Sequence, residues 1–427
     1  MAREMKDSGI EWIGEIPKDW LVKKIKHGFT IFAGATPKSE KSEYWNGKIS
    51  WITPADYKTE DKYVYTGRKN ISMEGYKSCG TTIVPKGSVI FSKRAPVGTV
   101  AISGNELCTN QGCLACVPLS MTDSIFFYYV ISVFTEQFEL VSSGTTFKEI
   151  SANTFANFPL PFPIYEEQIK ISSFLDRKCA ELDNVLEKTR ASIEEYKKLK
   201  QAVITQAVTK GVRGNREMKD SQSIWFGQIP RVWEMRKIKY IFKIQKDIAG
   251  EEGHTVLSIT QKGIKPKDLS KNEGQLAENY SNYQLVHIGD FAMNHMDLLT
   301  GWVDVSKYEG VTSPDYRVFG LIDKDNYCSQ YYLYLMQMCY TNRIFYGLGQ
   351  GVSGLGRWRL QADKFLNFSI TVPSYEEQKE IANYLDKKCS AIDELIAKKE
   401  QYLSEIENYK KSLIYEYVTG KKEVPQE

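Results

Sequence analysis

The chain has 427 residues, of which 42% are hydrophobic and 26% are charged, and its net charge at pH 7 is +3. This composition is typical of a soluble protein that buries sizeable cores, and so small a charge excludes inferring any partner from the overall electrostatic field. Because a single core rarely grows beyond roughly 250 residues, we expect more than one domain.

The apolar stretches are too short for a membrane protein. Residues 1–9 lack the apolar run of a signal peptide, and the longest apolar stretch is Ile125–Phe134. A helix that spans a bilayer needs about 18 to 20 apolar residues. We therefore expect a cytoplasmic protein.

The first half of the chain opens with the pattern W-x-G-x-I-P-x-x-W, formed by Trp12, Gly14, Ile16, Pro17 and Trp20. A region of mixed character follows, in which apolar β-type runs alternate with Gly and Pro turns. The expected elements are strands at 48–52, 88–91 and 114–118, an apolar helix at 124–138, a loop at 142–146 and a closing strand at 158–162.

Three of the eight cysteines, Cys108, Cys113 and Cys116, lie close together in this region. A C-x-x-C spacing can present two thiolates to zinc. The residues between and after them are apolar and β-like, however, and a reduced cysteine behaves as a small hydrophobic residue. We favour packing in a core over a metal site. Cys179 and Cys389 occupy equivalent places in the two halves, and we expect them to pack on helices.

A long amphipathic helix is expected at residues 183–208, about 39 Å long at 1.5 Å per residue. Along this helix, apolar residues that include Val185, Ile193, Tyr196 and Leu199 recur at spacings near three and four and form a stripe on one face. Residues 211–215 then supply a hinge, because a glycine after a helix permits the left-handed cap conformation.

The second half repeats this order. The opening pattern returns as Trp225, Gly227, Ile229, Pro230 and Trp233, a shift of 225 − 12 = 213, and Tyr165-Glu166-Glu167-Gln168 returns as Tyr375-Glu376-Glu377-Gln378, a shift of 375 − 165 = 210. The expected elements are strands at 257–260 and 290–294, an apolar helix at 330–346, a glycine-rich loop at 347–356 and a helix at 393–418, whose stripe includes Ile392, Leu395, Tyr402, Ile406, Tyr409, Leu413 and Tyr417.

A duplicated framework around unlike sequence predicts one scaffold that presents two different surfaces. We expect an α/β (α+β) fold with two pseudo-twofold-related globular domains separated by a pair of long antiparallel helices, the last of which returns to the start of the chain. The expected segments are 1–164 and 215–374 for the globular domains and 165–214 and 375–427 for the helical spacers.

In these repeated motifs, in this order and twice, the chain resembles the specificity subunits of type I restriction-modification systems. The resemblance covers nearly the whole chain and includes Phe174-Leu175-Asp176 and Tyr384-Leu385-Asp386. It implies two target-recognition domains that each read one half of a bipartite DNA site. It also implies that the helices set the gap and dock two modification (methyltransferase) subunits, with restriction and translocation subunits as further partners. S-adenosylmethionine and ATP with Mg²⁺ are expected on those partners, and no cofactor on this chain.

The helix length agrees with this interpretation, because half-sites one DNA turn apart lie about 34 Å from centre to centre. Phosphate contacts need Lys and Arg, whereas base reading needs forked or amide side chains on loops. Basic clusters at the entrance to each variable region are candidate phosphate contacts, with a solvated strand surface as the equal alternative. These clusters are Lys23, Lys24 and Lys26 in the first domain and Arg236, Lys237 and Lys239 in the second. The candidates for base reading are Lys93, Arg94, Thr145, Thr146 and Lys148 in the first domain, and Asn294, His295, Arg357 and Arg359 in the second.

Enzymatic motifs are weak or missing. Residues 349–354 match G-x-G-x-x-G, but the dinucleotide fingerprint requires a strand before it and a helix after it, and here an apolar helix precedes it. No P-loop pattern occurs, no N/D-P-P-Y segment of an amino-methyltransferase is found, and the four histidines are scattered. We expect a non-catalytic chain with no metal site. The alternative function is a duplicated coiled-coil scaffold that joins proteins without binding DNA.

Overall fold

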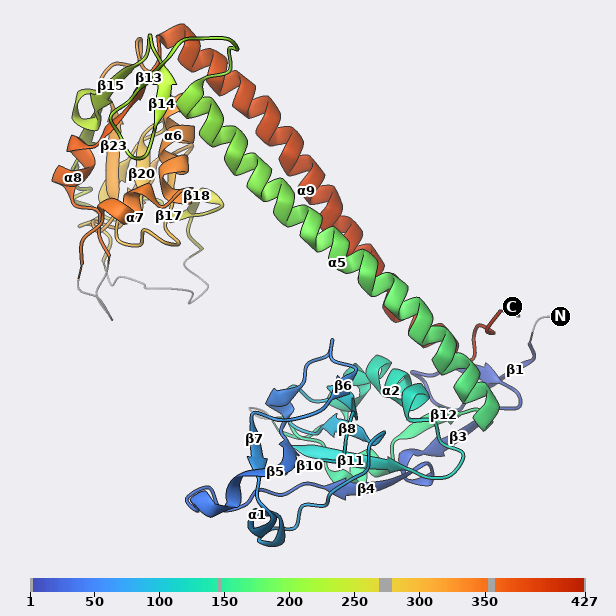
Figure 1. The fold of residues 1–427 in the computed structure, drawn as a ribbon. Helices are drawn as coiled ribbons and strands as arrows, with labels where there is room; N and C mark the ends of the chain where they lie inside the picture. The colour runs from blue at the N-terminus through green and yellow to red at the C-terminus, as the bar shows by residue number, and fades with distance from the viewer. Residues whose placement is uncertain (1–2, 145–147, 269–278, 352–357, 426–427) are drawn as a thin grey trace. The chain divides into compact units, whose positions relative to one another are not determined.

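The computed structural model describes residues 3–144, 148–268, 279–351 and 358–425 (Figure 1). The chain divides into two compact units. Unit 1 consists of Met1–Thr189 with Gln401–Glu427, and unit 2 consists of Arg190–Glu400. Each unit therefore combines a mixed α/β domain with parts of two long helices.

The main sheet of unit 1 has five strands in the order β4-β11-β8-β9-β6. The runs expected at 88–91 and 114–118 are confirmed as its central strands, which pair antiparallel with Leu114 opposite Phe91. Both strands are almost entirely buried because the sheet is covered on its two faces. The strands are β4 (Phe29–Ala33), β11 (Cys113–Pro118), β8 (Val89–Ser92), β9 (Val100–Ser103) and β6 (Tyr63–Val64).

Smaller sheets complete unit 1. The strand expected at 48–52 is the end of β5, which lies between β10 and β7 in a three-stranded sheet. Two ribbons, β1-β2 and β12-β3, lie outside the main sheet. Their bounds are β5 (Trp45–Ile52), β7 (Lys69–Ile71), β10 (Cys108–Thr109), β1 (Met5–Asp7), β2 (Glu15–Pro17), β3 (Leu21–Lys24) and β12 (Pro159–Phe162), and two short helices are α1 (Met73–Lys77) and α4 (Ala152–Ala156).

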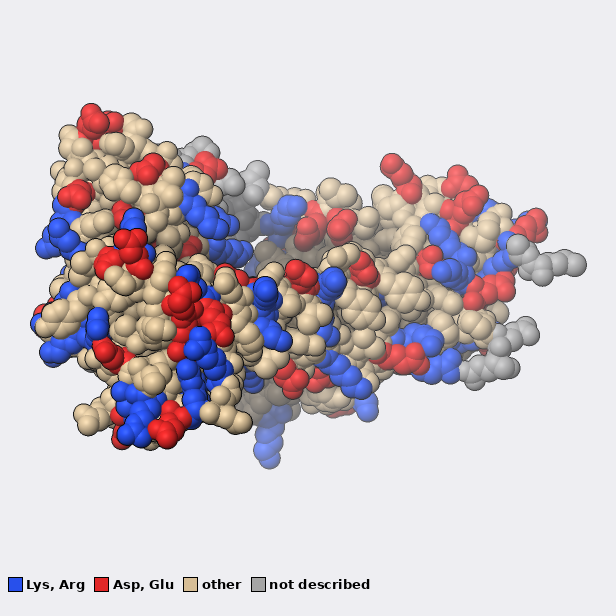
Figure 2. Space-filling model, turned by 90° about the horizontal axis from the view of Figure 1, so that it is seen from above, with Lys and Arg blue, Asp and Glu red and all other residues tan. Residues whose placement is uncertain are grey.

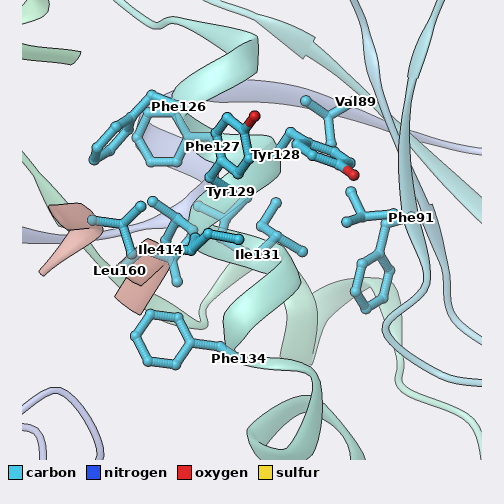
Figure 3. Close-up of a cluster of buried hydrophobic side chains, with 14 of the residues drawn as sticks. Val89, Phe91, Phe126, Phe127, Tyr128, Tyr129, Ile131, Phe134, Leu160 and Ile414 are labelled. Atoms are coloured by element: carbon cyan, nitrogen blue, oxygen red, sulfur yellow. The ribbon is translucent and has the colours of Figure 1, made fainter. Parts of the chain in front are cut away.

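The apolar helix expected at 124–138 is interrupted. It forms α2 (Ser124–Val133) and α3 (Thr135–Leu140), because Phe134 leaves the helical conformation to cap one helix and start the next. Figure 3 shows the rings of Phe126 and Phe127 in one buried cluster with Leu160 and Ile414. Ile414 lies near the end of the chain, so distant segments of the sequence share this core.

Unit 2 follows the same plan. Its main sheet has the order β16-β23-β20-β21, which repeats the β4-β11-β8-β9 order of unit 1. The strands expected at 257–260 and 290–294 are confirmed as β17 and β20, whereas the helix expected at 330–346 breaks at Arg343, which adopts a left-handed conformation. The elements are β16 (Phe242–Gln245), β23 (Arg317–Leu321), β20 (Phe291–Met293), β21 (Val303–Val305), α6 (Ser329–Thr341), α7 (Ile344–Leu348) and α8 (Ala362–Asn367).

Paired strands surround this sheet as well. The ribbon β13-β14 repeats β1-β2, and β15-β24 repeats β12-β3. The remaining pairs are β17-β18 and β19-β22. Their bounds are β13 (Met218–Asp220), β14 (Gln228–Pro230), β15 (Glu234–Lys237), β24 (Ser369–Val372), β17 (Leu257–Thr260), β18 (Gly263–Pro266), β19 (Gln284–Val286) and β22 (Gly310–Thr312).

The expected lengths of the two long helices are wrong. The helix α5 (Tyr165–Lys210) has 46 residues and α9 (Tyr375–Val418) has 44, instead of 26 each. The extra turns pack on the globular domains, and in unit 1 they also contact the end of α9. In unit 1 this face is formed by Ile171, Leu175 and Cys179, which are buried at a spacing of four. A search for a heptad stripe overlooks such a face.

Within each unit the helices run antiparallel, as expected. In unit 1, Lys410 of α9 binds Asp183 of α5 at 2.6 Å, and Tyr417 packs on Phe174. In unit 2, Lys200 binds Asp393 at 2.6 Å. Each core is completed by the end of one helix, since Val208 is buried in unit 2 and Val418 in unit 1, a shift of 418 − 208 = 210.

The expected stripe on the last helix is only partly correct. Ile392, Ile406, Leu413 and Tyr417 are buried. By contrast, Leu395, Tyr402 and Tyr409 are 42%, 49% and 56% exposed, at a spacing of seven residues along α9. These three residues form a second apolar face that stays exposed among the described residues. Among the described residues, no helix is both long and apolar enough to cross a membrane.

The repeated Tyr-Glu-Glu-Gln motif fastens each long helix to its domain. Gln168 accepts a hydrogen bond from the backbone N–H of Asp123 at 2.8 Å and donates to the carbonyl of Pro163 at 2.9 Å. Gln378 repeats both bonds, at the same distances, with Cys328 and Pro373. Asp123 and Cys328 are the N-caps of α2 and α6, so one amide satisfies a helix start and a strand end together.

We expect Gln378→Ala to lower the free energy of unfolding of unit 2 by about 2 to 4 kcal/mol, because a buried N–H and a buried carbonyl lose their partner. Chemical denaturation of the full chain measures this loss. Gln401→Ala is the control, since its amide binds Glu405 on the exposed surface of α9 and its removal should change stability by less than about 0.5 kcal/mol. Equal effects of the two substitutions would contradict the role of Gln378.

The glutamates that precede these two glutamines, Glu167 and Glu377, also have equivalent partners in the two units. Arg3 binds Glu167 at 2.5 Å, and Arg216 binds Glu377, with a shift of 216 − 3 = 213 that equals the shift of the tryptophan pattern. The duplicated sequence therefore encodes duplicated contacts. The Phe-Leu-Asp and Tyr-Leu-Asp motifs behave alike, because Tyr129 donates to Asp176 at 2.6 Å and Tyr334 donates to Asp386 at 2.7 Å.

Candidate nucleic-acid interface

Two candidates of the first domain, Lys93 and Arg94, lie at the end of β8. Lys93 and Arg94 both bind the carboxylate of Glu149, at 2.8 and 2.9 Å. Backbone bonds join the same two segments, since Arg94 forms a β-bridge with Glu149 and the N–H of Ile150 donates to the carbonyl of Lys93 at 3.0 Å. Two loops that lie 55 residues apart in the sequence thus form one basic surface.

Electrostatics at this surface are internally balanced. The hydrogen bond from Lys93 and the positive charges of Lys93 and Arg94 lower the pKa of Glu149. Arg94 remains about half exposed, and Lys148, next to Glu149, is exposed. These cations face solvent where they could meet phosphates. Thr145 and Thr146 lie outside the described residues.

The basic clusters at the entrance of each domain lie on separate ribbons. Lys23 and Lys24 end β3, which pairs with β12 rather than with the sheet that carries β8, and Lys26 follows in a short 3-10 turn. Their equivalents Arg236, Lys237 and Lys239 lie on β15 and the turn after it. All six are exposed. Arg236 is held by Glu234 at 2.7 Å and by the hydroxyl of Tyr327.

In the second domain, Asn294 and His295 follow β20 as Lys93 and Arg94 follow β8. The side-chain oxygen of Asn294 accepts hydrogen bonds from the N–H groups of Met296 and Asp297, so it is used within a turn. Arg359 is exposed and pairs through its backbone with Gln350, while Arg357 lies outside the described residues. The carbonyl of His295 accepts from the N–H of Leu360 at 2.9 Å, which brings His295 and Arg359 into one region.

Sequence reasoning missed Arg317, the first residue of β23. Its side chain is only 6% exposed, and its Nη2 donates to the carbonyl of Leu360 at 2.8 Å. Nη1 has no partner among the described residues, and the guanidinium lies 5.0 Å from the centre of the Phe365 ring. Comparison of the repeats could have revealed it, because β11 begins with the apolar Cys113 where β23 begins with arginine.

Burial, together with the positive charges of Arg317 and Arg359, lowers the pKa of His295 to about 4, while the charge of Asp315 acts in the opposite direction. The imidazole is therefore neutral at pH 7. Its Nδ1 is buried without a partner among the described residues. Desolvation likewise lowers the pKa of Arg317 to about 10, so the guanidinium stays charged at neutral pH although burial disfavours the charge.

This shift predicts a pH-dependent stability of unit 2. An unfolded histidine titrates near 6.5 and the folded one near 4, so the unfolded state binds the extra proton between these values. Stability is unaffected above pH 6.5 and falls as the pH drops from 6.5 towards 4. We expect the melting temperature of the wild type to fall more between pH 7.5 and pH 5 than that of His295→Gln. Parallel pH profiles of the two proteins would contradict the assignment.

Cys108, Cys113 and Cys116 lie in the core of the first domain as expected. Burial raises the pKa of Cys108 and of Cys113 to about 12 and raises that of Cys116 as well, so all three are thiols at pH 7. Zinc binds thiolates, so these environments oppose metal binding. The hydroxyl of Tyr57 lies 3.6 Å from the Cys113 sulfur.

Surface charge is mixed in sign. Figure 2 shows Lys and Arg side chains interspersed with Asp and Glu over the face that it draws. A sequence-specific contact must therefore depend on local groups such as those at the ends of β8 and β20, rather than on one broad basic face.

Comparison with known proteins agrees with the duplicated architecture. A family described as the type I restriction modification DNA specificity domain matches the chain twice, at residues 17–195 and 230–408. Each match spans one globular domain and the first part of the long helix that follows it.

Several curated relatives are specificity subunits. The MjaIX specificity subunit of Methanocaldococcus jannaschii is 34% identical over 240 residues, which cover 55% of this chain and 54% of that protein. The MjaVIII specificity subunit of the same organism is 26% identical over 313 residues, or 70% of each chain. In the first alignment, therefore, this chain spans about half the length of its relative.

Solved structures share the fold. One comes from a study of the structural basis of complex assembly and conformational transition of the type I R-M system. It aligns with this chain with a TM-score of 0.70 and 12% identity, over 94% of this chain and 98% of the solved chain. The HsdS subunit from Thermoanaerobacter tengcongensis aligns with a TM-score of 0.52 and 14% identity, over 95% of this chain and 98% of that subunit. With two family domains over most of its length, the chain belongs to the type I restriction modification DNA specificity family.

Proposed function

We propose that this chain is the DNA-recognition subunit of a type I restriction-modification complex, in which each globular domain reads one half of a bipartite duplex site. The proposed recognition domains are residues 1–164 and 215–374, with spacers at 165–214 and 375–427 that set the gap. The chain itself performs no catalysis in this proposal.

One observation carries this proposal: equivalent strand ends on a repeated framework bear unlike polar groups. Lys93 and Arg94 follow β8, whereas Asn294 and His295 follow β20 in a sheet of the same strand order. Two readers of different sequences need this combination, because the framework fixes position and the loop side chains select bases.

The proposed partners are two modification subunits, with restriction and translocation subunits beyond them. The exposed face formed by Leu395, Tyr402 and Tyr409 supports a helical partner, since residues seven apart line one side of a helix. S-adenosylmethionine and ATP with Mg²⁺ would bind those partners and not this chain. The proposed location is the cytoplasm, where these subunits and their DNA meet.

The test is genome-wide mapping of methylated adenines in cells with and without this gene, followed by footprinting of the purified complex. We expect one bipartite motif that disappears with the gene, and a footprint over both of its halves whose affinity falls steeply as salt rises. A footprint without sequence preference would overturn the proposal in favour of a coiled-coil scaffold that joins proteins.

A further inference from the structure

A cavity opens beside β23 in unit 2. Its volume is about 490 Å³, and twelve residues line it. Three of them are the cations Lys246, Arg317 and Arg359, a fourth is His295, and none is an Asp or Glu. The cavity therefore gathers positive charge without a lining carboxylate.

The guanidinium of Arg317 is the unusual group in this cavity. Only 6% of Arg317 is exposed, and among the described residues it forms no ion pair. Taking a charge out of water without a counter-charge is strongly unfavourable. The carbonyl of Leu360 and the ring of Phe365 contact only part of the group, and Nη1 is left without a partner.

At the equivalent place in unit 1, a carboxylate of the chain itself neutralises the positive charges. There Glu149 binds both Lys93 and Arg94. The shift of 210 that relates the helical motifs also relates Ile150 to Leu360, whose N–H groups donate to the carbonyls of Lys93 and His295. Ile150 is preceded by Glu149, whereas Leu360 is preceded by Arg359. The second domain thus has an arginine where the first has the neutralising carboxylate.

We infer that this cavity binds a phosphate of the DNA backbone, with Arg317 at its floor and Arg359 and Lys246 at its mouth. A formal negative charge is required because a neutral base edge would leave the buried guanidinium uncompensated. This inference rests on the proposed function, since it assigns the ligand to duplex DNA.

The test uses the complex of the full chain with its modification subunits, a duplex that contains the mapped target and a duplex with scrambled half-sites. In Arg359→Glu, the new carboxylate should pair with Arg317, just as Glu149 pairs with Lys93 and Arg94 in unit 1. We expect affinity near 0.1 M salt to fall about tenfold on both duplexes, with the salt dependence of log Kd reduced by about 0.9, the value for one lost phosphate contact. The melting temperature should not fall.

Lys246→Glu should act in the same direction. Lys324→Glu is the matched control, because Lys324 is an exposed lysine beyond the opposite end of β23 and the change in charge is the same. Arg317→Lys, which retains the charge and loses the fork, provides a second measurement, with a loss of about threefold to tenfold in affinity expected for a weakened charge-assisted contact.

Three results are distinguishable. If Arg359→Glu and Lys246→Glu bind both duplexes like the control, the phosphate site is wrong while the proposed function stands. A loss confined to the target, with an unchanged salt dependence, would also overturn the phosphate and indicate a base contact instead. If the wild-type complex itself does not prefer the target, the proposed function fails, whatever the variants do.

Discussion

Val208→Asp is expected to unfold unit 2 and to leave unit 1 folded. The side chain of Val208 is fully buried in the core of unit 2, beside the hydroxyl of Tyr331 and the ribbon strand that contains Thr371. A carboxylate at this position loses its water without gaining a cation, at a cost on the order of 3 to 5 kcal/mol. That is a large part of the 5 to 15 kcal/mol that stabilises a typical domain. Limited proteolysis should cut unit 2 and spare unit 1.

The duplication supplies the reciprocal experiment. Val418 is fully buried in unit 1, so Val418→Asp should expose unit 1 and spare unit 2. Leu199→Asp controls for a new charge on α5, because Leu199 is 48% exposed. If either core substitution exposed both units equally, the cores would not be independent.

A matched insertion of seven residues in both long helices is expected to lengthen the DNA gap by about 3 base pairs. The insertions follow Thr189 in α5 and Glu400 in α9, where the two units divide. Seven residues add about 10.5 Å and nearly two full turns, so the helix faces stay in phase to within about 20°. If the proposed function holds, mapping of methylated adenines should report both half-sites unchanged and their separation increased.

A single insertion in α5 serves as the control. It displaces Asp183 and Lys200 relative to their partners Lys410 and Asp393, so the antiparallel pairing cannot be kept on both sides of the insertion. We expect a loss of stability and of methylation rather than a new gap. An unchanged gap after the double insertion would show that the helices do not measure the site.

Local patterns predicted much of the fold. The strands β8, β11, β17 and β20 follow from short apolar runs, and the duplication follows from two sequence patterns with nearly equal shifts. The lengths of α5 and α9 did not follow from the amphipathic stripes, because the first turns of both helices are buried in the cores of the globular domains, where the stripes do not continue. Likewise, the breaks at Phe134 and Arg343 depend on packing that no periodicity records.

The candidate site was predictable only in part. The residues after β8 and β20 were identified because strand ends project side chains into loops, and the structure gathers Lys93, Arg94 and Glu149 as neighbours. Arg317 was missed, since its burial without a counter-charge arises only when β23 and the segment before α8 come together. An arginine at the start of an apolar strand resembles an ordinary strand boundary.

The last turns of α9 have a consequence for biosynthesis. Ile414, Tyr417 and Val418 complete the core of unit 1, and Tyr415 bonds the backbone of Trp12 and Ile13 at 3.2 Å. The ribosome therefore makes most of unit 1 first but supplies these core residues only after Arg190–Glu400, the whole of unit 2, has been synthesised. A nascent chain stalled before residue 413 exposes an incomplete apolar core, so the earlier-made domain cannot mature until translation has passed residue 418.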